Sequence, residues 1–260
     1  MTAERPASAT PGLRFRPVSA TLSHPGLPQS ATGQATLLTG LNGADVMNGH
    51  YGPWPGPTLK RTLDEGTVFS EVLAAGGRVA LANAFPPGYF RALQTGQRRV
   101  NVPVYAAERA GVRLRTPADY AAGRATSADL DGGYLGQPRP LHESGGQLAR
   151  LARDYDLTFF DFWLSDTAGH RWPLERAADL AAKLDGFLAG VASALDNTTL
   201  LVTSDHGNLE DKATRSHTRN PVPLLAAGPQ AEVFAEVGSL LEVAPALRKA
   251  LGLDAQAQRR

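Results

Sequence analysis

The chain has 260 residues and a net charge of +1, with 42% hydrophobic residues, 20% charged residues and no cysteine. Its near-neutral charge gives no reason to expect a nucleic acid or a membrane surface as partner. Without cysteine, disulfides, thiolate zinc sites and cysteine nucleophiles are excluded, so a metal ion must be held by histidine and carboxylate, which suits Zn²⁺ or Mn²⁺. No apolar run is long enough to span a membrane and no signal-peptide core is present, so a cytoplasmic location is expected.

The first third of the chain predicts an α/β pattern. Residues 1–12 are small, polar and proline-containing, which predicts a disordered leader. The segment "GLPQSATGQATLLTGLNG" then predicts a short helix that stops at Gly40 and Gly43. After a Gly/Pro-rich loop, "TLKRTLDEGTVFSEVLAAGG" has helical spacing and "RVALANAF" reads as a strand. Helix followed by strand indicates an α/β fold with a mostly parallel central sheet, a three-layer sandwich.

Residues 86–142 have a different pattern, with short segments, many turns and a cluster of arginines, which predicts a small inserted lid. The metal-binding core would then comprise residues 13–85 and 143–260. Its second part predicts a helix in "ESGGQLARLARDY", a strand in "DLTFFDFWLSD" and a long helix in "PLERAADLAAKLDGFLAGVASAL". The strands "TLLVTSD" and "VPLLAAG" and a closing helix in "EVGSLLEVAPALRKALG" complete the chain.

Two of these predicted strands, "TFFDFWLSD" and "TLLVTSD", end in Ser-Asp, at Asp166 and Asp205. In an open parallel sheet, ligands bind beyond the carboxyl ends of the strands, so both aspartates are expected at one edge. His170 and His206 follow them closely, and His217 can return to the same edge on a loop. Each aspartate alone could merely cap the following helix. A cluster of aspartates and histidines in a chain without cysteine instead favours a site for a divalent metal ion.

Ser30 is a candidate nucleophile. It can be read as the N-cap of the helix in "PQSATGQATLL", and a helix N-terminus also favours an anion such as phosphate. A hydroxyl at that position, bound to a divalent ion, can become a nucleophile at neutral pH. Thr32 is the neighbouring alternative, and it is also a candidate for binding the substrate. The G-x-S-x-G elbow of serine hydrolases is absent around Ser30, which disfavours a Ser-His-Asp esterase.

The motifs "DTAGH", "SDHGNLED" and "SHTRNPVP" resemble the metal-binding motifs of the alkaline phosphatase superfamily, most closely the branch of cofactor-independent phosphoglycerate mutase and phosphopentomutase. "GLPQSATGQATLLTG" resembles the nucleophile segment of that branch, with Gln34 where the mutases usually have histidine. The resemblance implies two divalent ions, Mn²⁺ or Zn²⁺. The first would be held by Asp166, His170 and His217, and the second by Asp205, His206 and the Ser30 oxygen, with Ser30 forming a phosphoserine.

The sequence departs from this family before Ser30. The family opens with a strand whose final Asp is a further ligand of the second metal, and residues 1–29 contain no aspartate. Asp45 and Asp64 are poor substitutes, because one lies in a loop and the other in a helical pattern. We expect either that the chain begins late, which is favoured, or that the second metal site is incomplete.

The expected function is that of a metal-dependent phosphatase or phosphomutase acting on a small phosphate ester. The predicted lid is far smaller than that of the phosphoglycerate mutases, which disfavours that activity. Four arginines of the lid could bind a second anionic group, although a solvated arginine-rich face is an equal alternative: Arg98, Arg99, Arg113 and Arg115. The alternative function is a degenerate, non-catalytic member that binds metal. A sulfatase or phosphodiesterase is a third, less favoured possibility.

Overall fold

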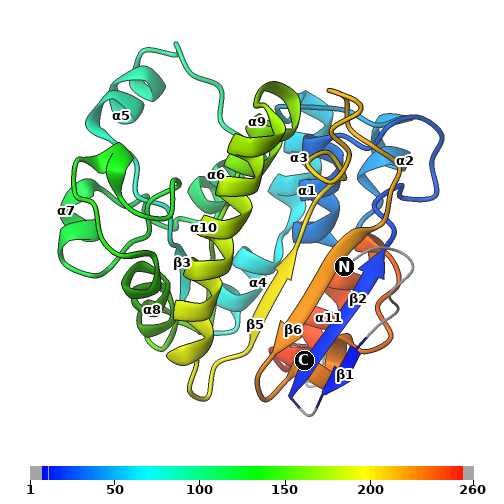
Figure 1. The fold of residues 1–260 in the computed structure, drawn as a ribbon. Coiled ribbons are helices and arrows are strands. Elements are labelled where there is room, and N and C mark those ends of the chain that lie inside the picture. Colours follow the sequence, from blue (N-terminus) through cyan, green and yellow to red (C-terminus); the bar gives the residue numbers. More distant parts are fainter. Residues whose placement is uncertain (1–7, 11, 254–260) are drawn as a thin grey trace.

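The computed structural model describes residues 8–10 and 12–253 and folds as an α/β protein (Figure 1). The strands are β1 (Ser8–Thr10), β2 (Leu13–Val18), β3 (Val79–Leu81), β4 (Leu157–Phe159), β5 (Leu200–Thr203) and β6 (Val222–Ala227). The helices are α1 (Ser30–Thr39), α2 (Gly43–Met47), α3 (Pro57–Glu65), α4 (Val68–Ala74), α5 (Pro87–Gln94), α6 (Val102–Arg109), α7 (Pro117–Ala121), α8 (Leu141–Ala152), α9 (Leu164–Arg171), α10 (Leu174–Ser193) and α11 (Val243–Ala250). Short 3₁₀ turns are η1 (Gly133–Leu135), η2 (Ala231–Phe234) and η3 (Leu240–Glu242).

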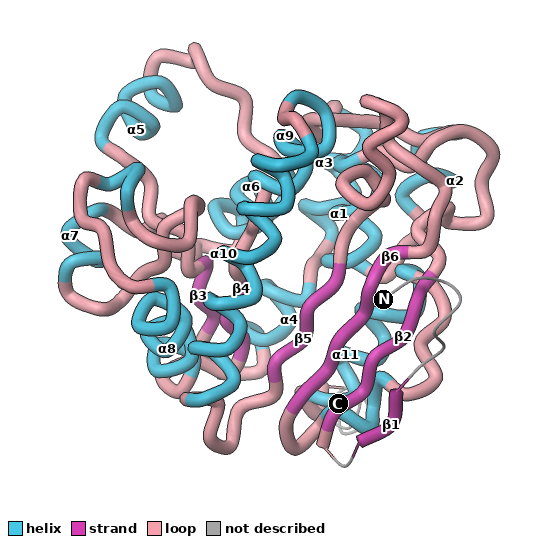
Figure 2. The backbone as a smooth tube through the Cα atoms, viewed as in Figure 1, coloured by secondary structure: helices cyan, strands magenta, loops and turns pink. Residues whose placement is uncertain are grey.

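The strands form two sheets. The larger has the order β1-β2-β6-β5, and the smaller pairs β3 with β4 (Figure 2). The α/β class is confirmed, but the strand directions differ from the expected mostly parallel sheet. Among the described strands, β3 and β4 run parallel, whereas β2 and β5 each pair antiparallel with β6. The N-terminal strand β2 lies beside β6 and pairs with it, with Val18 opposite Val222. This pairing was not expected from the sequence, because the periodicity of a strand does not determine which strand it pairs with.

Helices cover the strands from both sides, with α10 in front in Figure 1 and α11 behind. The largest apolar core joins α1, α3, α4 and α6 to β3, through buried side chains such as Leu38, Leu59, Phe69 and Leu81. On the other side, α8 and α10 approach closely through glycines. A Cβ on Gly145 would overlap the carbonyl of Phe187, and one on Gly190 would overlap the carbonyl of His142. These glycines let the two backbones touch.

Several expected elements take a different form. The helix expected from "TLKRTLDEGTVFSEVLAAGG" is two helices, because Gly66 ends α3 and Thr67 caps α4 in a reciprocal capping box with Ser70. Of the predicted disordered leader, residues 1–7 and 11 lie outside the described residues, and Ser8–Thr10 form β1. Within the predicted lid, α6 contributes Val102 and Val104 to the same core as α1. The division of the chain into core and lid stays a prediction.

Across residues 8–10 and 12–253, no helix has both the length and the apolar character required to cross a bilayer.

Candidate metal centre

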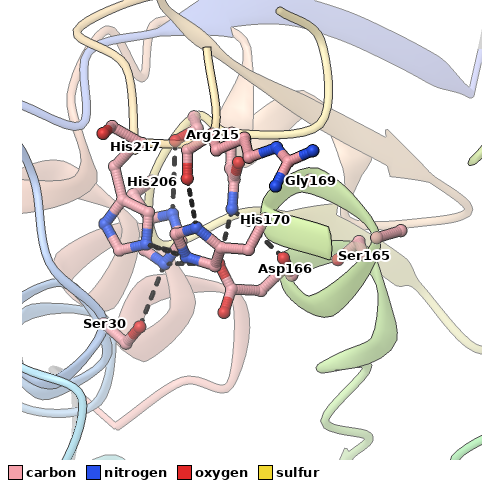
Figure 3. A network of polar contacts seen from close by, with 12 residues as sticks. Ser30, Ser165, Asp166, Gly169, His170, His206, Arg215 and His217 are labelled. Carbon is pink, nitrogen blue, oxygen red and sulfur yellow. Dashed lines mark hydrogen bonds and ion pairs between the residues drawn. The ribbon is translucent and has the colours of Figure 1, made fainter. Parts of the chain in front are cut away.

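Four separate segments bring polar side chains to one place (Figure 3). The N-terminus of α1 provides Ser30, and α9 provides Asp166 and His170. His206 follows β5, and His217 precedes β6. The candidate ligands predicted from the sequence therefore come from chain positions far apart and converge in space.

Asp166 lies at the centre of three imidazoles. Its Oδ1 atom is 3.2 Å from Nε2 of His170, 3.3 Å from Nε2 of His217 and 3.8 Å from Nε2 of His206. The Nε2 atoms of His170 and His217 are 3.0 Å apart, and the rings of His206 and His217 are stacked with centroids 3.7 Å apart. Asp166, His170 and His217 offer ligand atoms that all lie within 4.8 Å of one another.

The other ring nitrogen of each histidine is held by the backbone. Nδ1 of His170 contacts the carbonyl of Arg215 at 2.5 Å, and Nδ1 of His217 contacts that of Pro28 at 2.7 Å. His206 makes a longer contact, 3.3 Å, with the carbonyl of Gly207. A carbonyl only accepts, so each Nδ1 carries a proton, and in the neutral imidazole Nε2 then has the lone pair that a metal ion binds. Histidine ligands of metals have this arrangement.

Ser30 is the first residue of α1, and Gln29 is the N-cap, so the predicted N-cap role of Ser30 is wrong by one position. The Ser30 hydroxyl therefore does not cap the helix; its Oγ lies 3.0 Å from Nε2 of His206. Gly33 allows this approach, because a Cβ there would overlap the carbonyl oxygen of Asp205. The glycine lets α1 pack directly on the end of β5 and places Ser30 beside the histidines.

Electrostatics at the centre favour a positive charge next to Asp166. Burial alone would raise the pKa of Asp166, but hydrogen bonds from His217 and Asn208 outweigh it and lower that pKa to about 2. Burial alone would lower the pKa of His217, but its bonds to Asp166 and to the Pro28 carbonyl and the charges of Asp166 and Asp205 together outweigh burial, and the pKa is raised. A proton on His217 thus places a positive charge where the arrangement of ligand atoms fits a metal cation.

Two buried acceptors also point to a cation. The Oε1 atom of Gln34 and the Oδ1 atom of Asn208 are buried and have no hydrogen-bond partner within the described part of the chain. Gln34 donates its Nε2 to Asp205 at 2.9 Å, and Asn208 donates its Nδ2 to Asp166 at 2.8 Å. Buried polar atoms are rarely left unpaired. The donors present, carboxylate oxygen and imidazole nitrogen, are those that Zn²⁺ and Mn²⁺ bind, so the residues fit a divalent ion.

Asp166 reaches this centre by a different route from the one expected. The strand β4 ends at Phe159, and Asp166 lies in the first turn of α9 rather than at a strand end. Asp166 and His170 share one face of α9 because they are four residues apart on a helix. Asp205 lies two residues after the last residue of β5, close to the strand end as expected.

The residues proposed to bind substrate are engaged elsewhere in the fold. Thr32 is buried and donates to the carbonyl of Gln29 at 3.0 Å. Arg113 forms a bidentate pair with Asp119, at 2.8 and 2.9 Å. Arg115 is buried and donates to the carbonyls of Leu81 and Arg124, and the Arg98 guanidinium lies over the ring of Tyr89. None of these contacts involves the histidine cluster; Arg99 lies in the loop between α5 and α6, and a substrate role for these residues stays a prediction.

Sequence reasoning missed the residues that order the loop after His206. The Glu210 carboxylate accepts from the backbone N–H of Asn208 at 2.7 Å and from the hydroxyl of Thr218 and the amide of Asn220. This joins the segment carrying His206 to the one carrying His217. The sequence did draw attention to Asn208 and Glu210, since both lie within the "SDHGNLED" motif. A motif does not show, however, which residues form hydrogen bonds with one another.

Comparison with known proteins agrees with this geometry. The family described as "Metalloenzyme superfamily" matches residues 146–255, which include Asp166, His170, Asp205, His206 and His217. A 2,3-bisphosphoglycerate-independent phosphoglycerate mutase of Coxiella burnetii (strain Dugway 5J108-111) is 36% identical over 110 residues. Over this part, the chain is similar to the metalloenzyme superfamily and to the phosphoglycerate mutases.

The matched segment is short relative to these relatives. It covers 39% of this chain and 21% of the Coxiella protein. The mutase of the same name from Pseudomonas fluorescens (strain Pf0-1) is 33% identical over 113 residues, which are 40% of this chain and 22% of that protein. For the fold, an alkaline phosphatase from the Antarctic bacterium TAB5 aligns with a TM-score of 0.52 and 14% identity, over 92% of this chain and 88% of that one.

Proposed function

We propose that the protein is a metal-dependent phosphoryl-transfer enzyme, a phosphatase or phosphomutase, that acts on a small phosphate ester through Ser30 and two divalent ions. The observation that carries the proposal is the convergence of three Nε2 atoms on Asp166, with the Ser30 hydroxyl 3.0 Å from His206. Relatedness to the phosphoglycerate mutases supports phosphoryl transfer.

The residues present have distinct tasks in this reaction. Asp166, His170 and His217 would hold one ion, and Asp205 and His206 would hold the other next to Ser30. Bound ions would supply positive charge that neutralises the phosphoryl group and lowers the pKa of the serine hydroxyl. The N-terminus of α1 would favour the same anion, because the positive end of the helix dipole lies at Ser30.

Group transfer would proceed in two balanced steps. The Ser30 Oγ loses its proton and forms a bond to phosphorus, while the ester oxygen departs and is protonated as the alcohol. Water then takes the phosphoryl group in a phosphatase, or a second substrate hydroxyl takes it in a mutase; either restores Ser30. A degenerate protein that binds metal without turnover is the second candidate, favoured because Asp166, His170 and His217 are, among the described residues, the group whose ligand atoms lie within 4.8 Å of one another.

The test is hydrolysis of p-nitrophenyl phosphate by the purified chain with added Mn²⁺ or Zn²⁺, compared with Ser30→Ala. A matched control is Ser193→Ala, since Ser193 lies on α10 and its hydroxyl donates to the carbonyl of Gly190. We expect metal-dependent turnover that disappears in Ser30→Ala, survives in Ser193→Ala and is lost with a chelator. No turnover by the folded, metal-loaded chain favours the non-catalytic candidate. Equal rates in wild type and Ser30→Ala remove Ser30 from the mechanism.

A further inference from the structure

Lys212 lies in the loop between β5 and β6 and binds the last turn of α9. Its Nζ atom donates to the carbonyl of Ala168 at 2.8 Å and to that of Gly169 at 2.9 Å. Carbonyls in the last turn of a helix lack partners within that helix, and a lysine there also complements the negative end of the helix dipole. The ammonium group of Lys212 therefore joins the loop to the end of α9.

The same loop orients the ring of His170. Nδ1 of His170 contacts the carbonyl of Arg215, three residues after Lys212, at 2.5 Å (Figure 3). Gly169, whose carbonyl accepts from Lys212, directly precedes His170. One short stretch of loop thus fixes His170 twice, by the backbone beside it through Lys212 and by its ring through Arg215. Because a carbonyl only accepts, the contact with the ring keeps a proton on Nδ1 and leaves Nε2 of the neutral imidazole free for a metal ion.

The base of the loop is closed independently of Lys212. The N–H of Thr218 donates to the carbonyl of Gly207 at 3.0 Å, which joins the two ends of the loop. Between these ends, in the described part of the chain, the side-chain hydrogen bonds from residues 209–216 to α9 come from Lys212. Loss of Lys212 should therefore free the middle of the loop, including the carbonyl that orients His170, and leave the base closed.

We propose that Lys212 is a positioning residue of the candidate metal centre. By holding the middle of the loop against α9, it fixes the orientation and the tautomer of His170, and it acts on a metal ion through that ring. The role of the ion rests on the proposed function, whereas the tautomer of His170 can be measured in the metal-free chain. A lysine that only stabilised the end of a helix would have no effect on the ring of His170, so the two explanations give different results.

The first measurement is the tautomer of His170 in the full, metal-free chain, by NMR of the imidazole nitrogens at a pH of about 8.5, where neutral imidazole prevails. We expect the proton on Nδ1 in wild type and a mixture of both tautomers in Lys212→Met, whose side chain has a similar length but cannot donate. Lys212→Arg keeps the donors and should restore the wild-type tautomer. Lys249→Met is the matched control, because Lys249 is an exposed lysine in the last turn of α11. It should leave His170 unchanged.

The second measurement is the Mn²⁺ affinity of the same variants, by isothermal titration calorimetry. Loss of a residue that orients a histidine ligand costs roughly ten- to a hundredfold in metal affinity, so Lys212→Met should bind Mn²⁺ at least about tenfold more weakly than wild type. Lys212→Arg should recover most of this loss, and Lys249→Met should bind as wild type does. If Lys212→Met does not fold, as judged by circular dichroism, Lys212→Leu is measured in the same way, with the same expectation and the same refuting result.

The outcomes separate this inference from the function on which it rests. If wild type binds Mn²⁺, an unchanged His170 tautomer or an unchanged Mn²⁺ affinity in Lys212→Met would overturn the role of Lys212 and leave the proposed function standing. If wild type binds no Mn²⁺, the proposed function is overturned, and the tautomer alone decides whether Lys212 positions the ring of His170. An equal loss of affinity in Lys212→Met and Lys249→Met would also refute the proposal, because a general effect of charge would then explain both.

Discussion

The Asp161 carboxylate should weaken the metal-free fold, and Asp161→Asn should relieve this. The pKa of Asp161 is raised from its ordinary 3.8 to about 6 by burial and by the charge of Asp205. An acid whose pKa is raised binds more protons in the folded state, so stability falls as the pH rises through the interval from about 4 to about 6. At 1.36 kcal/mol for each pKa unit, the loss has a ceiling of roughly 3 kcal/mol at neutral pH. Partial exposure of the side chain reduces this, so we expect about 1–3 kcal/mol.

The assay is urea unfolding of wild type, Asp161→Asn and, as a control, Asp154→Asn, whose side chain is exposed, in a chelator at about pH 3 and about pH 7.5. At the higher pH, the variant should be about 1–3 kcal/mol more stable than wild type. At the lower pH, its stability should be close to that of wild type, because Asp161 is protonated or nearly so in both the folded and the unfolded state. Asp154→Asn should change the free energy of unfolding by less than about 0.5 kcal/mol at both. The reasoning is refuted if Asp161→Asn destabilises the protein at the higher pH, or if its effect is the same at both.

Two further predictions concern helix packing and metal affinity. Gly190→Ala should destabilise the protein by about 1–3 kcal/mol in urea unfolding, because its methyl group would overlap the carbonyl of His142. Gly186→Ala on the same helix meets only Leu141 at 3.6 Å and should instead stabilise it by about 0.5–1 kcal/mol; destabilisation by both would contradict the packing argument. Because the pKa of His217 is raised, a metal ion must displace its proton, so Mn²⁺ affinity should fall about tenfold for each pH unit below that pKa. Calorimetry in buffers of different ionisation enthalpy should show proton release on binding, and no release would contradict the assignment of His217.

The cluster around Asp166 could be predicted from the sequence because its ligands occur in short motifs. Asp166 and His170 are four residues apart, and this spacing brings both side chains to one face of a helix, although a strand end was expected at Asp166. Asp205 and His206 follow a true strand. Their convergence with His217 was expected from the order of helices and strands, which the apolar periodicity indicates.

The direction of the strands and the surroundings of Asp161 could not be predicted in the same way. Both β2 and β6 have strand character, but their antiparallel pairing is a tertiary choice that alternation does not encode. The run "TFFDFWLSD" looks like one strand ending at Asp166, whereas the strand ends at Phe159 and Asp161 comes first. Its partners, Asn83 and Asn101, are 78 and 60 residues away in the chain. No local pattern connects residues at that separation.

Asp166 and Asp161 lie in opposite electrostatic environments when no metal is bound. Asp166 is surrounded by imidazoles and has a lowered pKa, because hydrogen bonds from His217 and Asn208 and the charges of His206 and His170 together outweigh its burial. Asp161 has a raised pKa, because burial and the charge of Asp205 both disfavour its ionised form. As the pH falls from neutral, Asp161 therefore takes up a proton before Asp166 does, and the cluster around Asp166 keeps the negative charge that a cation needs over a wider range of pH.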